Sequence, residues 1–174
     1  MDVSISIICQ SPCLWVGDHL EYCKKPAVIE GTSDLWTWVP ENASWVYLIK
    51  IMGFTLAYVP ENDTVYFVNP AYSIRNSCPS NIVFAAQCCR DPSCSPRLLV
   101  VDILCDCGKS TSLMEPVARY RRLQELQEHF LEPNCVVQWC GQKHSLTDEF
   151  LSSLPHKTRA RLGIGRVPGE FIVE

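Results

Sequence analysis

Apolar residues beyond position 35 recur at the spacing of β-strands, in short stretches separated by turn residues. The stretches are rich in β-branched and aromatic residues and predict five strands, at about 44–51, 53–59, 64–69, 81–89 and 97–105. Pro, Glu, Asn and Asp at positions 60–63 supply the turn between the second strand and the third. The fifth stretch is nearly continuous in apolar residues, as in a strand covered on both faces, and only Asp102 interrupts it.

The spacing changes to that of a helix after residue 112. Apolar side chains then recur every three or four positions, at Val117, Tyr120, Leu123, Leu126 and Phe130. Ser112 and Glu115 have the spacing of a capping box and Pro116 suits a first turn, so we predict a helix over 115–131. The other face is expected to carry charged residues, which is typical of a solvated surface rather than of an RNA contact: Arg119, Arg121, Arg122, Glu125 and Glu128.

Shorter signals continue to residue 174. They predict a strand over Cys135–Cys140, a short helix from about 145 to 154 and a final strand at 171–173. Residues 156–166 are basic, with Lys157, Arg159, Arg161 and Arg166. We therefore predict one α+β domain over residues 34–174, a mainly antiparallel sheet flanked by helices. The irregular residues 1–33 are predicted to be an N-terminal extension packed on this core.

Composition narrows the classes of function. The chain has 174 residues, of which 47% are hydrophobic and 20% charged, as in a globular domain. Its formal net charge of -4 argues against broad, sequence-independent nucleic-acid binding, but leaves room for a small nucleotide pocket. No segment has the length of a transmembrane helix, and the first residues lack the basic start of a signal peptide. We therefore expect an intracellular protein, cytoplasmic or nuclear, without a membrane partner.

Eleven cysteines are a high count for such a chain. The tightest group comprises Cys88, Cys89, Cys94, Cys105 and Cys107. Its spacing does not form the two Cys-x2-4-Cys pairs of a usual zinc site. In a reducing compartment we expect thiols, and those on predicted strands are better explained as small buried side chains than as metal ligands.

One lysine stands at the end of a predicted strand. Lys50 closes the strand at 44–51, and Gly53 opens the next one. This strand is followed by a hairpin, by further strands, by the strand that bears Asp102 and by a helix with Arg119, Tyr120 and Leu123. This order resembles the nucleotidyltransferase core of messenger-RNA capping enzymes and of ATP- or NAD-dependent ligases, whose covalent lysine lies in a Lys-x-Asp-Gly motif. Residues 34–53 and 97–108 are more similar still to the cap-binding domain of the snurportins, which is non-catalytic.

The departures from the enzyme pattern concern its acids. Met52 stands where the family has the aspartate of the lysine motif, and Gln87 stands where it has a glutamate that contacts ribose or metal. A lysine attacks phosphorus only as a neutral amine, and transfer from a triphosphate needs a cation held by carboxylates. The resemblance therefore implies that Lys50 is at most a degenerate nucleophile. It could still pair with a phosphate, or it could simply extend from a strand end to water.

Trp36 and Trp38 precede the lysine strand. In the snurportins, too, a tryptophan stands just before a Val-Pro step, as Trp38 does here, and a second one leads the strand with the degenerate lysine motif, as Trp45 does. Trp36 and Trp38 point to the same side if their segment is extended. Such a pair can stack on a methylated guanine, whose positive charge strengthens the contact with an aromatic ring. Tryptophans beside a β-sheet can equally serve core packing.

Three functions remain open. The first is a non-catalytic module that binds a nucleotide or an RNA 5′ cap through Trp36, Trp38, Lys50, Gln87 and Asp102. The second is a minimal guanylyl- or adenylyltransferase that forms an adduct on Lys50, the only hypothesis that involves a cofactor, magnesium. The third is a scaffold that binds a protein partner and has lost its nucleotide site. The missing acids disfavour the second.

Overall fold

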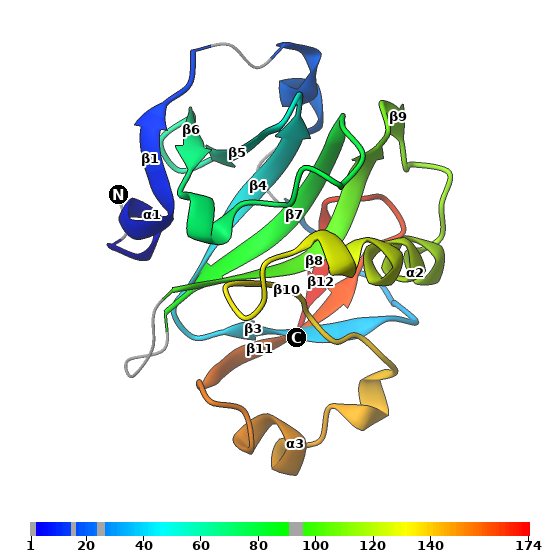
Figure 1. The fold of residues 1–174 in the computed structure, drawn as a ribbon. Coiled ribbons are helices and arrows are strands. Elements are labelled where there is room, and N and C mark those ends of the chain that lie inside the picture. The colour runs from blue at the N-terminus through cyan, green and yellow to red at the C-terminus, as the bar shows by residue number, and fades with distance from the viewer. Residues whose placement is uncertain (1–2, 15–16, 24–26, 91–95) are drawn as a thin grey trace.

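The five predicted strands form the centre of one large sheet in the computed structural model, which describes residues 3–14, 17–23, 27–90 and 96–174. They are β4 (Ala43–Ile51), β5 (Phe54–Val59), β6 (Thr64–Val68), β7 (Ile82–Cys89) and β8 (Arg97–Asp106). Within the described ranges the sheet has eight strands, which include β1 (Cys9–Pro12), β10 (Cys135–Val137) and β9 (Lys109–Ser110). Their order is β1-β6-β5-β4-β7-β8-β10, with β9 paired to β8. All pairings except that of β10 with β8 are antiparallel (Figure 1).

A smaller sheet packs against one face of the large sheet. Its order is β2 (Ala27–Val28), β12 (Glu170–Val173), β11 (Thr158–Ile164) and β3 (Trp36–Pro40). Side chains of both sheets meet in a buried layer that includes Val39, Tyr47, Ile49, Leu162 and Phe171. The smaller sheet lies below the large one in Figure 1, with α3 (Asp148–Ser152) beneath it.

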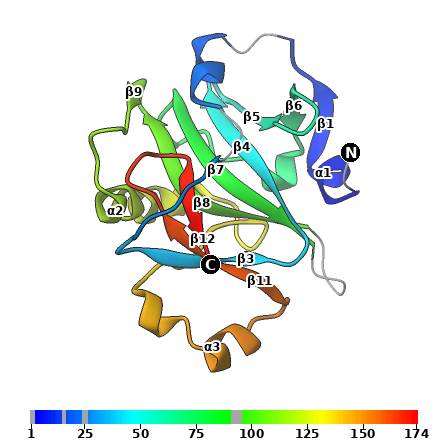
Figure 2. The same cartoon turned by 180° about the vertical axis from the view of Figure 1, so that it is seen from behind.

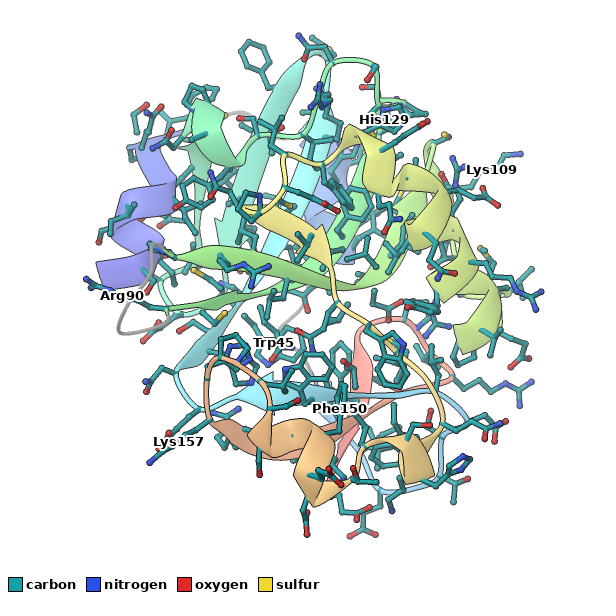
Figure 3. The ribbon with its side chains drawn as sticks, turned by 60° about the horizontal axis from the view of Figure 1, so that its bottom comes forward. Trp45, Arg90, Lys109, His129, Phe150 and Lys157 are labelled. Carbon is teal, nitrogen blue, oxygen red and sulfur yellow. The ribbon has the colours of Figure 1, made fainter. Side chains whose placement is uncertain are left out.

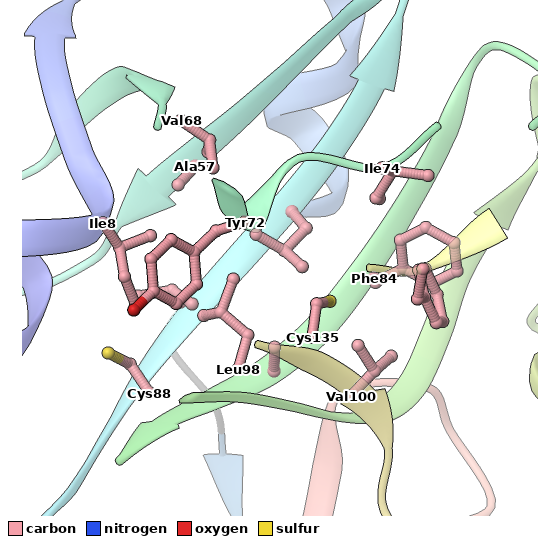
Figure 4. Close-up of a cluster of buried hydrophobic side chains, with 14 of the residues drawn as sticks. Ile8, Ala57, Val68, Tyr72, Ile74, Phe84, Cys88, Leu98, Val100 and Cys135 are labelled. Atoms are coloured by element: carbon pink, nitrogen blue, oxygen red, sulfur yellow. The ribbon is translucent and has the colours of Figure 1, made fainter. Parts of the chain in front are cut away.

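Helices and a loop cover the other face of the large sheet. These are α1 (Val3–Ile8), the 3-10 turn η2 (Pro70–Tyr72) and the paired elements α2 (Pro116–Leu126) and η3 (Gln127–His129). Figure 4 shows the core beneath them, in which Tyr72 and Ile74 lie over Phe84 and Leu98 of the sheet. The alternation of side chains along β4 explains the two layers. Val46 and Leu48 face this core, whereas Tyr47 and Ile49 face the layer between the sheets.

Several local predictions need correction. The helix begins at Pro116 without a capping box, because no side chain of the N-cap residue Glu115 bonds the first turn. The predicted strand over 135–140 is only β10 (Cys135–Val137), and it is parallel to β8. The basic segment contributes β11, for which its sequence gave no signal. The predicted short helix is found as α3, whose first turn is capped by the Thr147 hydroxyl.

The first 33 residues supply strands to both sheets. Strand β1 (Cys9–Pro12) pairs with β6 and β2 pairs with β12, while η1 (Gly17–Tyr22) lies between them in the chain. Figure 2 shows this path from behind, with the N-terminus beside the large sheet and the C-terminus at the smaller one.

The remaining 3-10 turn is η4 (Lys143–Ser145). An α+β domain with a mostly antiparallel sheet is therefore confirmed.

No helix within the described ranges has both the length and the apolar character needed to cross a membrane.

Candidate functional site

Lys50 lies at the end of β4, as predicted, but it does not reach water. Its side chain is 1% exposed, and its Nζ donates a hydrogen bond of 3.1 Å to Oδ1 of Asn76. Its side chain points to the same side of β4 as that of Leu48, two residues earlier, and its strand partner is Ile82. Lys50 therefore faces the core beneath η2 and α2. Burial lowers the pKa of Lys50 from its ordinary value, and the nearby Cys78 thiol opposes this effect. The interpretation of Lys50 as a strand-end lysine extending to water is therefore wrong.

The residue in the family's aspartate position turns away from Lys50. Met52 forms the β4–β5 turn with a φ of 48° and leaves its side chain 68% exposed. Its backbone N–H donates to the Ser80 hydroxyl at 2.8 Å. Gly53 follows with a φ of 83°, a left-handed conformation that glycine adopts without strain. The β4–β5 turn thus places the exposed Met52 side chain, and no acid, close to Lys50 in the chain.

Gln87 and Asp102 lie on the opposite face of the large sheet from Lys50. The Gln87 side chain points to the same side of β7 as those of Val83 and Ala85, and Asp102 is the strand partner of Ala85. Both therefore face the layer between the sheets. Gln87 is fully buried and donates through Nε2 to the Trp38 carbonyl at 3.1 Å. The sheet therefore separates these two predicted ligand-binding residues from Lys50.

Asp102 forms a buried ion pair with Arg119 of α2. The two oxygens of the carboxylate accept from Nε and Nη2 of Arg119 at 2.8 and 3.4 Å, and both side chains are 1% exposed. Arg119 also donates to the carbonyls of Met114, Gly165 and Arg166. Desolvation raises the pKa of the Asp102 carboxyl, and Arg119 opposes this rise. The pair ties α2 and β8 to the end of β11, which is a structural role. The prediction that Arg119 lies on the solvated face of the helix is therefore wrong.

The two tryptophans lie on the outer face of the smaller sheet and point to the same side, as predicted. The Trp36 ring is 4% exposed, and its indole N–H donates to the Ser33 carbonyl at 2.7 Å. Trp38, 6% exposed, donates to Nε2 of His156 at 3.2 Å and meets Phe150 edge to face. Figure 3 shows Phe150 pointing from α3 toward the sheets.

A cation already occupies the face of Trp36. The ammonium of Lys143 lies 4.9 Å from the centre of the ring, which is within the range of a cation–π contact. The same ammonium is paired with the carboxylate of Glu174, and both side chains are half-exposed. Gly163 of β11 lies beneath the ring, where a Cβ atom would approach it to 3.1 Å. Trp36 thus lies between the backbone of Gly163, which leaves space for the ring, and the half-exposed side chain of Lys143.

A groove runs along this outer face in three adjoining parts. The part beside Trp36 and Lys143 has a volume of about 440 Å³ and also includes Glu30 and Ile172. The middle part, about 910 Å³, shares Lys143 and Glu174 with it. The third part, about 610 Å³, shares Arg161 and Glu174 with the middle one and lies between α3 and β11. The sequence predicted Trp36 for a site, but gave no signal for Lys143 or Glu174, because only the fold brings them to the ring.

The cysteines of the predicted tight group do not converge. Cys88 belongs to the core beneath α1 and η2, whereas Cys105 belongs to the layer between the sheets. Cys107 is exposed in the turn after β8, and Cys94 lies outside the described residues. In the part of the chain that the structure describes, no group of three or more His, Cys, Asp or Glu side chains is arranged to hold a metal ion.

No protein-family model matches this chain, and no curated protein is similar enough to count as a match. The resemblance to nucleotidyltransferases and snurportins therefore stays a prediction from short motifs.

Proposed function

We propose that this chain is a non-catalytic binding module of nucleotidyltransferase-like fold that recognises a nucleotide or RNA 5′ cap in the groove beside Trp36. The observation that carries the proposal is the ammonium of Lys143 over the Trp36 ring. A ring that attracts one cation can attract another, and a 7-methylguanine carries its positive charge within a flat aromatic system. Binding would exchange the ammonium for the base.

The exchange is feasible because Lys143 is half-exposed and is held by a surface ion pair with Glu174 and by its contact with the Trp36 ring. Surface pairs of this kind contribute about 0–1 kcal/mol, so Lys143 can swing away at low cost. The released Glu174 carboxylate can then accept hydrogen bonds from the N–H groups of a guanine edge. Trp38 supports this wall by packing on Phe150, and unlike Trp36 it is not among the residues that line the three parts of the groove.

The test is quenching of tryptophan fluorescence by 7-methylguanosine, with guanosine as the uncharged comparison. Stacking contributes about 1–3 kcal/mol per base, so Trp36→Leu should weaken binding by about tenfold or more. Phe54→Leu, which removes an exposed aromatic ring at the start of β5 in the large sheet, is the control and should bind normally. Lys143→Ala should bind the methylated nucleoside more tightly, because no ammonium competes for the ring. Unchanged fluorescence at millimolar 7-methylguanosine refutes the proposal and favours a protein-binding scaffold.

A second candidate is the Lys50 nucleotidyltransferase, which one observation favours. Desolvation lowers the pKa of Lys50, as an amine nucleophile requires. Its Nζ is nevertheless bonded to Asn76 and is closed off from solvent. We expect no labelled protein after incubation with radioactive GTP or ATP and magnesium. A labelled band that is lost in Lys50→Ala would make the enzyme the better hypothesis.

A further inference from the structure

The groove that begins at Trp36 ends in a basic lobe between α3 and β11. This lobe is lined by Lys157, Arg159 and Arg161 of the β11 segment and by His156, together with two acidic residues, Asp148 and Glu174, of which Glu174 pairs with Lys143. Arg161 is paired with Asp148 at 3.0 Å. Neither Lys157 nor Arg159 has a carboxylate within 4.0 Å among the residues that the structure describes. The lobe therefore carries two uncompensated positive charges on a protein whose formal net charge is -4.

The backbone keeps this lobe open and in line with Trp36. Strand β12 pairs with β11 over Leu162–Ile164, and the Glu174 backbone that follows it bonds to the backbone of Arg161, so among the described residues no strand pairs with residues 158–160 on that side. Gly163 is in register with Trp36, and Arg161 is in register with Trp38. Two strand residues span about 7 Å, so the first arginine stands about that far along β11 from the stacking ring. The register shift between Thr158 and Ala160 marks a bulge at Arg159, a feature that redirects a side chain.

The lobe also has a polar floor of fixed orientation. The indole N–H of Trp38 can only donate, so Nε2 of His156 must accept in the hydrogen bond between them. A neutral His156 then carries its proton on Nδ1. Lys157 lies at the rim, as Figure 3 shows, with its side chain extended away from the ribbon. Positive groups at the rim and side of one hollow attract an anion more strongly than the same charges scattered over the surface.

We propose that this basic lobe binds the phosphate chain of an RNA 5′ end. The inference rests on the proposed function, in which the terminal base of that RNA stacks on Trp36. The phosphates run along β11 past Arg161 to Arg159 and Lys157, so the groove distinguishes a phosphorylated or capped end from a nucleoside. The contact is short, which agrees with a protein too acidic for extended, sequence-independent RNA binding.

The experiment compares four probes: 7-methylguanosine, 7-methylguanosine triphosphate, inorganic tripolyphosphate and a capped five-nucleotide RNA. The Lys157→Ala/Arg159→Ala variant is set against Lys109→Ala/Arg121→Ala, which removes the same charge from exposed positions on β9 and α2. Lys109 lies on the opposite side of the molecule from Lys157 in Figure 3. Equal circular dichroism spectra and melting temperatures establish that both variants fold as the wild type does.

The first variant should lose about tenfold in affinity for the triphosphate and the capped RNA, and nothing for the nucleoside. Its salt dependence for RNA, as the slope of log K against log salt, should fall by about 1.4, or 0.7 for each lost phosphate contact. The control variant should bind all four probes as the wild type does. Equal losses in both variants, or an unchanged slope, overturn the inference.

The same measurements separate this inference from the function on which it rests. If the nucleoside binds and phosphates add no affinity, the stacking site stands and the phosphate lobe falls. If tripolyphosphate binds through Lys157 and Arg159 while no nucleoside binds, the lobe stands and the stacking site falls. If none of the four probes binds, both fall.

Discussion

Breaking the buried pair between Asp102 and Arg119 should be among the costliest single changes in this protein. Removing one partner of a buried pair costs about 3–5 kcal/mol, because it leaves an uncompensated charge in the interior. Arg119→Met also leaves the carbonyls of Met114, Gly165 and Arg166 without their donor, and each such group adds about 1–3 kcal/mol. Asp102→Asn keeps the shape of the side chain. We expect about 3 kcal/mol for Asp102→Asn and at least about 5 for Arg119→Met.

Urea unfolding followed by circular dichroism measures these costs. The Arg122–Asp106 pair offers a matched control on the same helix, since its Nε–Oδ2 distance is also 2.8 Å but both side chains are about a quarter exposed. Arg122→Met should therefore cost less than about 1 kcal/mol. If Arg119→Met does not fold, sucrose or sulfate in all samples restores a measurable transition.

A double-mutant cycle tests the physical reason. In Asp102→Asn/Arg119→Met no charge is left uncompensated, so the double variant should be more stable than the sum of the single costs implies, by about 2 kcal/mol. Hydrogen exchange should rise at residues 165–170, which Arg119 and Asp102 hold to the large sheet. Additive costs, or a cost below about 1 kcal/mol for either single change, would show that the pair does not lock the two sheets together.

Two further predictions concern Lys50 and Gly163. The pKa of Lys50 is lowered in the folded state, so between that value and 10.5 the unfolded chain binds more protons, and the Lys50 contribution to stability increases with pH. Lys50→Met should therefore be more stable than the wild type at pH 7, and its advantage in urea unfolding should shrink toward pH 10; an advantage independent of pH contradicts this. Gly163→Ala should lower the melting temperature, because its Cβ would lie 3.1 Å from the Trp36 ring, at a cost of about 1–3 kcal/mol. Alanine in a strand is otherwise favoured over glycine, so an unchanged or raised melting temperature would mean that Trp36 yields.

Local pattern alone determined the central strands, the α2 helix and the α+β class. The alternation along β4 to β8 is a local property of the chain, because neighbouring side chains of a strand face opposite sides whatever the partner strand is. The position of Lys50 at a strand end and the common side of Trp36 and Trp38 follow from the same rule. The sequence could not show that β11 is a strand, since its basic residues resemble a loop until β3 and β12 pair with it.

Only the tertiary structure decided which of the predicted site residues lie together. The alternation of side chains along the strands places Lys50 on one side of the large sheet and Gln87 and Asp102 on the other. What each side chain meets there depends on which elements cover that side of the sheet. The partners of Trp36 come from positions 143, 163 and 174, which meet through strand pairing and through the loop after β10. Contacts between residues so distant in the chain depend on the register of whole strands, and no short motif encodes a register. The sequence therefore proposed the stacking residue, and the fold supplied its groove and its competing cation.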